Sequence, residues 1–512
     1  MSIPVIKRVT LLWILVALLA SCNSARSVSE PAPYWPTEDW RTSLPELQGV
    51  NSEQLVAMFE FIEEADMDLH SILIVRNGYL ITEAYFYPFQ QDAKHQLLCV
   101  TKSFLSALVG IAIGENYVDP VDHQVLDFFP ERTVANDDGR KATITLEHLL
   151  TMTAGWDWFH ESMRFEMMRS EDWVQFVLDR PLAEEPGTQF NYNTGNTYLL
   201  STILSSNIEI SPLSFARERV FEPLGITDVV WKADARGVLS PSDLQLTSRD
   251  LAKFGYLYLR RGLWEEQQVI PADWVAASAE KYIDTVWGTG YGYHWWTWGF
   301  GAYTAQGHGG QCLFVIPELD TVVVTTGGLA TSVCELPAGL LEDFVIPAAE
   351  SVTPLPENPQ MVARLELLIE QVEQPPEPQP MPPLPEIAHD VSERTFILED
   401  NDFCWQSFSL DAQPETRITF SNGDESVELT VGLDDIYRIT DGGQVGCPYY
   451  GIVLDGPVGA KGSWVDEMFL LDLQFLSGGD FSLRFEFDEN NVDIQVRDPA
   501  DRIENIHGVS QD

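Results

Sequence analysis

Basic residues are scarce in this chain. Its 512 residues include 30 Lys and Arg against 78 Asp and Glu, which gives a formal net charge of −48. A surface of this sign repels phosphate backbones and anionic headgroups, so binding to nucleic acid is excluded as its main function. The acidity favours a strongly solvated surface over a dedicated cationic partner, and we expect a monomer.

Clusters of metal-binding residues are also missing. The nine histidines do not gather at the spacings that metal ligands need, so we predict no metal and no cofactor. No internal repeat is evident. The composition is otherwise that of a globular protein, with 45% hydrophobic residues, and the length suggests two folded domains.

The chain has a targeting segment at its beginning. Lys7 and Arg8 precede the apolar run 9–20, which is too short to span a membrane with flanks. The run ends in Leu-Ala-Ser-Cys22, the pattern that lipoprotein signal peptidase cleaves. We therefore predict a signal peptide at residues 1–21, a tether at residues 22–40 and a lipid anchor on Cys22, with a plain hydrophobic anchor as the alternative. The mature protein would be exported, either periplasmic or on the outer face of the cytoplasmic membrane.

An odd number of cysteines remains after Cys22. They are Cys99, Cys312, Cys334, Cys404 and Cys447, so one thiol is expected to be free. An exported protein is permitted disulfides, and the simplest scheme pairs Cys312 with Cys334 and Cys404 with Cys447. A Cys99 to Cys312 bridge, acting as a switch, is the alternative.

The pattern of apolar residues predicts an α+β main domain at residues 41–351. An amphipathic helix at 51–66, with Asn51 as its N-cap, precedes a hairpin that turns at Asn77-Gly78. A mostly helical block follows from about 99 to 285, and then four short strands and a closing helix. The predicted architecture is an antiparallel sheet flanked by helices, with an inserted helical subdomain.

The remainder of the chain has a different composition. Ten prolines lie between 352 and 390, around one helical stretch, so residues 352–388 are predicted to be a linker. Strand patterns such as FSLRFEF recur after it and predict an all-β sandwich or barrel at residues 389–506.

A candidate nucleophile opens the helical block. In Cys99-Val-Thr-Lys102 the thiol precedes an apolar helix, and Lys102 lies one turn further on the same face. The positive end of the helix dipole and the nearby ammonium both favour a thiolate. A buried structural cysteine beside a surface lysine is the other interpretation of this tetrapeptide.

The surrounding segments resemble the serine β-lactamase-related family, which includes class C β-lactamases, D-Ala-D-Ala carboxypeptidases, other penicillin-binding-protein-like enzymes and allied esterases. The family's Ser-x-x-Lys motif is replaced here by Cys99-x-x-Lys102. Its Tyr-x-Asn motif is matched by Tyr192, with Thr194 in place of the asparagine, so that Asn193 or Asn196 would substitute for it. The resemblance covers about residues 45 to 350 and implies the β-lactamase/transpeptidase-like fold.

The third motif of the family, Lys-Thr-Gly or His-x-Gly on a strand, is matched by His308, Gly309 and Gly310. The resemblance implies that Lys102 and Tyr192 share the proton transfers and that His308 orients Tyr192 or the substrate. It also implies an oxyanion hole from the backbone amides of Cys99 and Gln311, with Gly310 giving the substrate room. Aromatic residues at Trp156, Trp158 and Phe159 predict an aromatic-walled cleft.

Two functions follow from the sequence. The first is an exported acyl hydrolase, acting on an ester, an amide or a short peptide through a covalent intermediate on Cys99. The second is a catalytically silent member of the family that binds peptidoglycan fragments or a partner. The joint presence of Lys102, Tyr192 and the His308 motif favours the enzyme.

Overall fold

The structure is a computed structural model of the chain. It describes residues 34–329, 333–349, 351–413, 415–442, 446–447, 452–453, 456–497 and 502–511, with the backbone alone at 160–162, 446–447 and 452–453. The predicted signal peptide and Cys22 lie outside these ranges. Among the helices described, none is long and apolar enough to cross a membrane.

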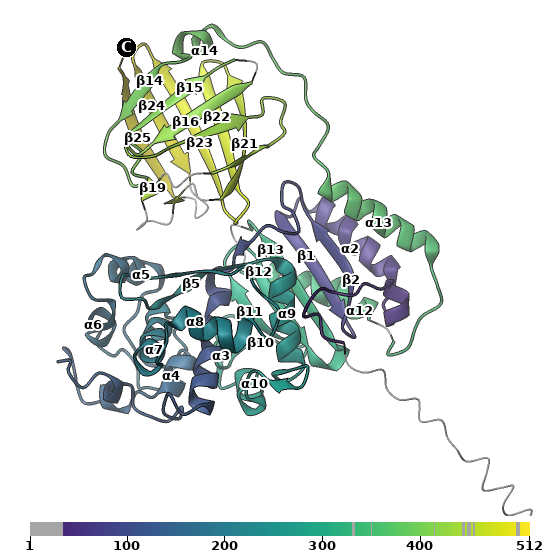
Figure 1. Ribbon diagram of the computed structural model, residues 1–512, viewed down its shortest axis with the longest axis vertical. Coiled ribbons are helices and arrows are strands. Elements are labelled where there is room, and N and C mark those ends of the chain that lie inside the picture. The colour runs from purple at the N-terminus through teal and green to yellow at the C-terminus, as the bar shows by residue number, and fades with distance from the viewer. Residues whose placement is uncertain are drawn as a thin grey trace, which may run out of the picture. The chain divides into compact units, whose positions relative to one another are not determined.

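The first domain is built on an antiparallel sheet (Figure 1). Its strands, in order across the sheet, are β2 (Tyr79–Tyr85), β1 (Leu69–Arg76), β13 (Thr321–Gly327), β12 (Gln311–Ile316), β11 (Tyr303–Gly307), β10 (Trp296–Thr297), β9 (Gly290–Tyr291) and β8 (Ile283–Asp284). β1 is buried along its whole length, because helices cover both faces of the sheet. The hairpin predicted at Asn77-Gly78 is confirmed as the β1–β2 connection, with both turn residues at positive φ.

Two helical layers enclose this sheet. On one face lie α2 (Ser52–Glu64), α11 (Glu335–Leu340), α12 (Ile346–Ala348) and α13 (Pro359–Glu373), which share a core with Ile72, Phe314 and Val323. Asn51 caps α2 by accepting a hydrogen bond from Glu53 N, as predicted. On the other face lies α9 (Ser248–Leu259), in which a Cβ on Gly255 would come within 2.5 Å of Leu313. Glycine there lets the helix approach the strands.

A helical subdomain is inserted between β2 and β8, as the sequence predicted. Its helices are α3 (Thr101–Gly114), α4 (Leu146–Leu150), α5 (His160–Arg169), α6 (Trp173–Leu178), α7 (Thr194–Asn207), α8 (Pro212–Ala216) and α10 (Ala272–Ser278). A small sheet of β3 (His95–Gln96), β5 (Leu239–Leu246) and β4 (Val230–Ala233) accompanies them. In Figure 1, α3 and α7 run side by side in the interior of this block.

The helix expected inside the linker belongs to the first domain. α13 packs on α2, and Leu365 and Leu368 are buried in the core of that domain. The apolar face of α13 is therefore buried against the first domain. The extended proline-rich stretch begins only after Glu373. The prolines on either side of this helix show where it ends. They do not show which domain covers its apolar face.

The second domain is a nearly closed β-barrel (Figure 1). Its strands are β14 (Thr395–Leu398), β15 (Ser407–Asp411), β16 (Thr416–Ser421), β17 (Ser426–Val431), β18 (Arg438–Asp441), β21 (Pro457–Val465), β22 (Met468–Phe475), β23 (Asp480–Asp488), β24 (Asn491–Arg497) and β25 (Ile503–Ser510). In β23 buried and exposed residues alternate, with Phe485 and Leu483 directed into the core. β25 runs to Ser510, slightly beyond the expected boundary at 506.

Candidate active site

Cys99 lies at the entrance to α3. A short 3-10 turn (Leu98–Val100) leads directly into the helix, and Leu98 before the cysteine has a φ of 47°. A branched residue rarely adopts this left-handed conformation, and such strained residues cluster at functional sites. Cys99 is half-buried, and it is the free cysteine of the described chain.

The environment of Cys99 favours its thiolate. Burial raises the pKa of the thiol, but the charge of Lys102, hydrogen bonds with Tyr192 and Lys102 and the charge of Arg164 together lower it below its usual value. Lys102 is 1% exposed, and its Nζ makes no hydrogen bond to oxygen or nitrogen among the described residues. That Nζ lies 5.2 Å from the ring centroid of Tyr192. The structure thus brings together three of the four predicted catalytic side chains.

The segment before α7 positions Tyr192. Asn193 is the N-cap of this helix and accepts a hydrogen bond from Asn196 N at 3.2 Å. The side chain of Asn196 accepts a hydrogen bond from Trp156 Nε1 at 2.9 Å. Both amides are buried and committed to these structural contacts. The side-chain oxygen of each asparagine therefore has a structural partner, and the replacement of the family's substrate-binding asparagine by one of them stays a prediction.

β11 supplies the backbone that lies against the nucleophile. A Cβ on Gly307, its last residue, would stand 2.6 Å from Leu97 O and 3.3 Å from Cys99 N. Glycine is required at this close approach. Gln311, the expected second oxyanion donor, begins β12 and pairs with Gly307 across the ladder. The residue of this strand pair that lies against Cys99 is therefore Gly307 of β11.

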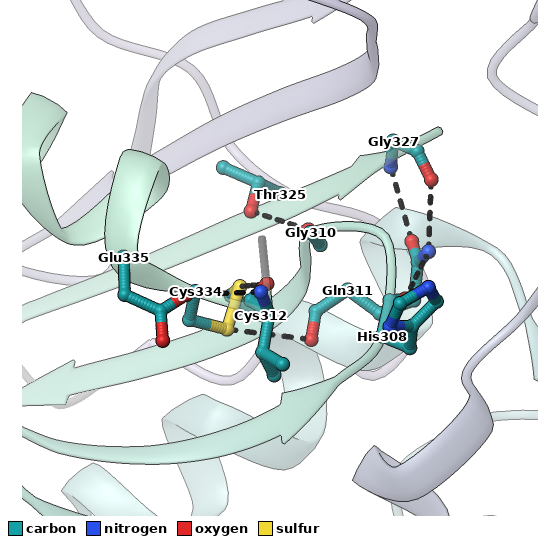
Figure 2. Close-up of a disulfide and its surroundings, with 9 residues drawn as sticks. His308, Gly310, Gln311, Cys312, Thr325, Gly327, Cys334 and Glu335 are labelled. Atoms are coloured by element: carbon teal, nitrogen blue, oxygen red, sulfur yellow. Dashed lines mark hydrogen bonds between the residues drawn. A yellow bond between two sulfur atoms is a disulfide. The ribbon is translucent and has the colours of Figure 1, made fainter. Parts of the chain in front are cut away.

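Side-chain hydrogen bonds hold the turn between β11 and β12 in place (Figure 2). The Gln311 side chain donates to Gly327 O at 2.8 Å and to His308 O at 2.9 Å, and accepts from Gly327 N at 3.0 Å. Thr325 Oγ1 donates to Gly310 O at 2.9 Å. Gln311 therefore stabilises the turn through its side chain.

His308 lies in that turn and is exposed, whereas the sequence placed it on a strand. No interaction of its imidazole with Cys99, Lys102 or Tyr192 is present among the described residues. Its role in orienting Tyr192 or the substrate stays a prediction. The motif places His308 beside the site, but the turn directs its side chain to solvent.

A disulfide joins Cys312 of β12 to Cys334, as predicted (Figure 2). The alternative bridge between Cys99 and Cys312 is wrong, since Cys99 is free. Cys404 is also disulfide-bonded. The side chain of Cys447, its predicted partner, lies outside the described residues.

His294 is a residue of the site that the sequence analysis missed. It is 2% exposed, its Nε2 lies 3.1 Å from Thr197 Oγ1 of α7, and its carbonyl accepts a hydrogen bond from Ser103 Oγ of α3 at 2.7 Å. Burial and the charge of Lys102 lower its pKa to about 3, so this imidazole is neutral near pH 7. A lone histidine within GYGYHWWTW carries no sequence signal, because its position beside Lys102 arises only from folding.

Aromatic residues beside Cys99 come from a different segment than predicted. Trp156 and Trp158 are buried, whereas Phe159 is 82% exposed. The rings that extend outward from the nucleophile, called the aromatic wall below, are Phe190, Tyr192, Trp287, Tyr291 and Trp296. Burial and the charge of Cys99 raise the pKa of Tyr291. The wall assembles from two segments about 100 residues apart, which the local sequence does not reveal.

Comparisons with known proteins agree with the fold. Residues 62–327, more than half of the chain, match the Beta-lactamase family. The chain is 24% identical over 329 residues to a 6-aminohexanoate-dimer hydrolase of Paenarthrobacter ureafaciens, covering 59% of this chain and 80% of that protein. A putative 6-aminohexanoate-dimer hydrolase from Bacillus anthracis has a similar structure, with a TM-score of 0.51, 20% identity, and coverage of 64% of this chain and 91% of that chain.

A penicillin-binding protein homologue from Caulobacter crescentus is similar over 56% of this chain and 93% of its own, with a TM-score of 0.46 and 16% identity. With the sheet, the inserted helical subdomain and the Cys99, Lys102 and Tyr192 arrangement, the family match identifies this chain as a member of the β-lactamase family.

Proposed function

We propose that this protein is an exported acyl hydrolase that cleaves an ester or amide through an acyl thioester on Cys99. The observation that carries the proposal is the free thiol of Cys99, whose pKa is lowered by Lys102 and Tyr192 at the entrance to α3. A structural cysteine has no need of a buried ammonium beside it, and burying that ammonium costs free energy.

The first half of the reaction forms the thioester. The Cys99 thiolate attacks the carbonyl carbon, the C–S bond forms, and the carbonyl π electrons move to oxygen. The amide of Cys99, next to Gly307, stabilises this oxyanion as one donor of the hole. Tyr192, assisted by the charge of Lys102, donates a proton to the leaving oxygen or nitrogen as its bond to the carbonyl carbon breaks.

The second half restores the enzyme. Water attacks the thioester carbon while Tyr192 accepts a proton from it, and the C–S bond breaks to release the acid and the thiolate. Sulfur forms longer bonds than oxygen, so a site shaped for serine would hold the carbonyl away from its donors, and a displacement of about 1 Å costs about 100-fold in rate. We expect activated esters and thioesters to react, amides and β-lactams to react poorly, and the acyl thioester to accumulate.

Export and lipid anchoring are part of the proposal. The Leu-Ala-Ser-Cys22 pattern supports them, and so does the Cys312–Cys334 disulfide, because such bridges persist in oxidising compartments. Detergent phase separation of the wild type and Cys22→Ala tests the anchor. The wild type is expected in the detergent phase and the variant in the aqueous phase, and identical partitioning would contradict it.

Turnover of phenyl acetate by the wild type, Cys99→Ser and Cys99→Ala tests the reaction, with intact-mass detection of the acyl adduct. Loss of turnover in both variants, with an adduct on Cys99 in the wild type, is the expected result. A gain in Cys99→Ser would mean that the cysteine has crippled a serine site. If all three proteins are inactive and form no adduct, the binding-module function would replace the hydrolase function.

A further inference from the structure

The aromatic wall is continuous from the nucleophile to the solvent. Tyr192 is stacked on Trp296 at a centroid distance of 5.9 Å, and Tyr291 packs edge-on against Trp296 at 4.9 Å. Trp296 lies 5.6 Å from both Phe190 and Trp287. Each ring therefore contacts the next, beginning with the tyrosine that is hydrogen-bonded to Cys99.

The outer end of the wall is exposed, whereas its middle is buried. Tyr291 is 1% exposed and Trp296 9%, Phe190 and Tyr192 are half-buried, and Trp287 at the far end is 57% exposed. Val286, beside Trp287 at the tip of the β8–β9 hairpin, is 80% exposed. A tryptophan and a valine left in water at the outer end of the wall favour an apolar ligand, since large apolar surface is usually buried.

The side chains around the wall offer few hydrogen bonds to a ligand. Met152 and Ile283 complete its cluster. At the hairpin tip the hydroxyls of Thr285 and Thr289 are hydrogen-bonded to each other at 2.8 Å. Met152 and Ile283 are apolar and the two threonine hydroxyls are already paired, which favours an apolar group over a sugar or a charged group. The chemistry of the wall therefore fits an aromatic or aliphatic group.

We propose that the aromatic wall binds the leaving group, so that the preferred substrates are esters or amides of bulky apolar alcohols or amines. This inference rests on the proposed function. The residue that returns a proton to the leaving atom must lie within hydrogen-bond reach of that atom. Tyr192 is that residue and also the innermost ring of the wall. A group attached to the leaving atom therefore emerges along Trp296 and Trp287, while the acyl group stays on Cys99.

The test compares aryl acetates whose leaving phenols have similar acidity: phenyl, biphenyl-4-yl and 4-carboxyphenyl acetate. The wild type is expected to prefer the biphenyl ester over the phenyl ester about tenfold in kcat/KM, and to disfavour the carboxylate. Trp287→Ala should remove most of this preference and Trp287→Phe should retain it. Phe61→Ala, which removes a partly exposed ring from α2, is the matched control and should keep the preference.

A comparison of phenyl hexanoate with phenyl acetate tests the opposite possibility, that the wall binds the acyl group. If Trp287→Ala lowers the preference for the hexanoyl group and leaves the biphenyl preference intact, the wall binds the acyl group and the proposal is overturned. Turnover by the wild type without preference among the aryl acetates also overturns it, but leaves the hydrolase standing. No turnover and no adduct on Cys99 with any ester overturns both.

Discussion

The two domains bury very different side chains. Among the described residues of the barrel, the buried polar side chains are Thr416 and Gln474, neither of which ionises, and the rest of its core is apolar. The first domain buries Lys102, Lys141 and His294 with exposures of 2% or less. Burying an ionisable group costs free energy, so each buried group of the first domain needs a structural or a catalytic reason.

The first domain also contains an internal control for this argument. Lys141 Nζ donates to the carbonyls of Ala135 and Leu178 at 2.6 and 2.7 Å, so its ammonium is solvated by the backbone. Lys102 has no such partners, and its charge acts on Cys99 instead. A buried lysine is therefore not by itself a sign of catalysis, whereas one placed against a nucleophile is.

The largest expected effect is a loss of stability in the barrel that leaves catalysis unchanged. Leu471→Ala empties a fully buried position of the barrel core and should lower the free energy of unfolding of that domain by about 3 to 4 kcal/mol. Turnover of phenyl acetate should not change. Leu105→Ala in α3, equally buried, is the matched variant and should lower stability and turnover together. A loss of turnover in Leu471→Ala at temperatures where the barrel is folded would give the barrel a role in the site.

Removal of the disulfide tests how the β11–β12 turn is held. The Cys312→Ser, Cys334→Ser double variant releases a loop closed over a separation of 22 residues. By the loop-entropy estimate the cost is about 3 kcal/mol, measured by denaturant unfolding. Peptide mapping of the wild type under non-reducing conditions should show alkylation of Cys99 and protection of Cys312. Alkylation of Cys312 before reduction would contradict the bridge.

Lys102→Met should impair the nucleophile more than the fold. Loss of the ammonium raises the pKa of Cys99, and below that pKa each unit of increase reduces the thiolate tenfold. Ester turnover should fall about 100-fold, and the pH profile of iodoacetamide labelling at Cys99 should move to higher pH. Lys141→Met is the matched control, which should lower stability and leave the labelling profile in place. An unchanged profile in Lys102→Met would remove Lys102 from the site.

The smallest effect per pH unit concerns His294 and acid. Its pKa of about 3 in the folded state lies below the ordinary value of about 6.5. Between these values the unfolded state takes up a proton that the folded state does not, so stability falls as the pH falls through this window, by up to about 1.4 kcal/mol per unit. His294→Gln should make the unfolding free energy of the first domain less steep between pH 6.5 and 4. An unchanged slope in His294→Gln would contradict a buried, neutral imidazole at this position.

Much of the fold was predictable because its signals are local. Asn51 caps α2 through its own side chain, and Asn77-Gly78 turns the β1–β2 hairpin through its own backbone. The alternating residues of β23 marked an all-β domain for the same reason. By contrast, α13 was assigned to a linker, since nothing in its sequence specifies that α2 covers its apolar face.

The candidate site divides in the same way. The sequence alone pointed to Cys99, Lys102 and Tyr192, because the segments that contain them resemble the motifs of the β-lactamase family. Only the tertiary structure decided that Gly307 faces the Cys99 amide, that His294 lies beside Lys102, and that Trp287 and Trp296 extend the wall from Tyr192. These contacts join segments far apart in the chain, and their energies depend on packing between elements, which no local pattern of residues records.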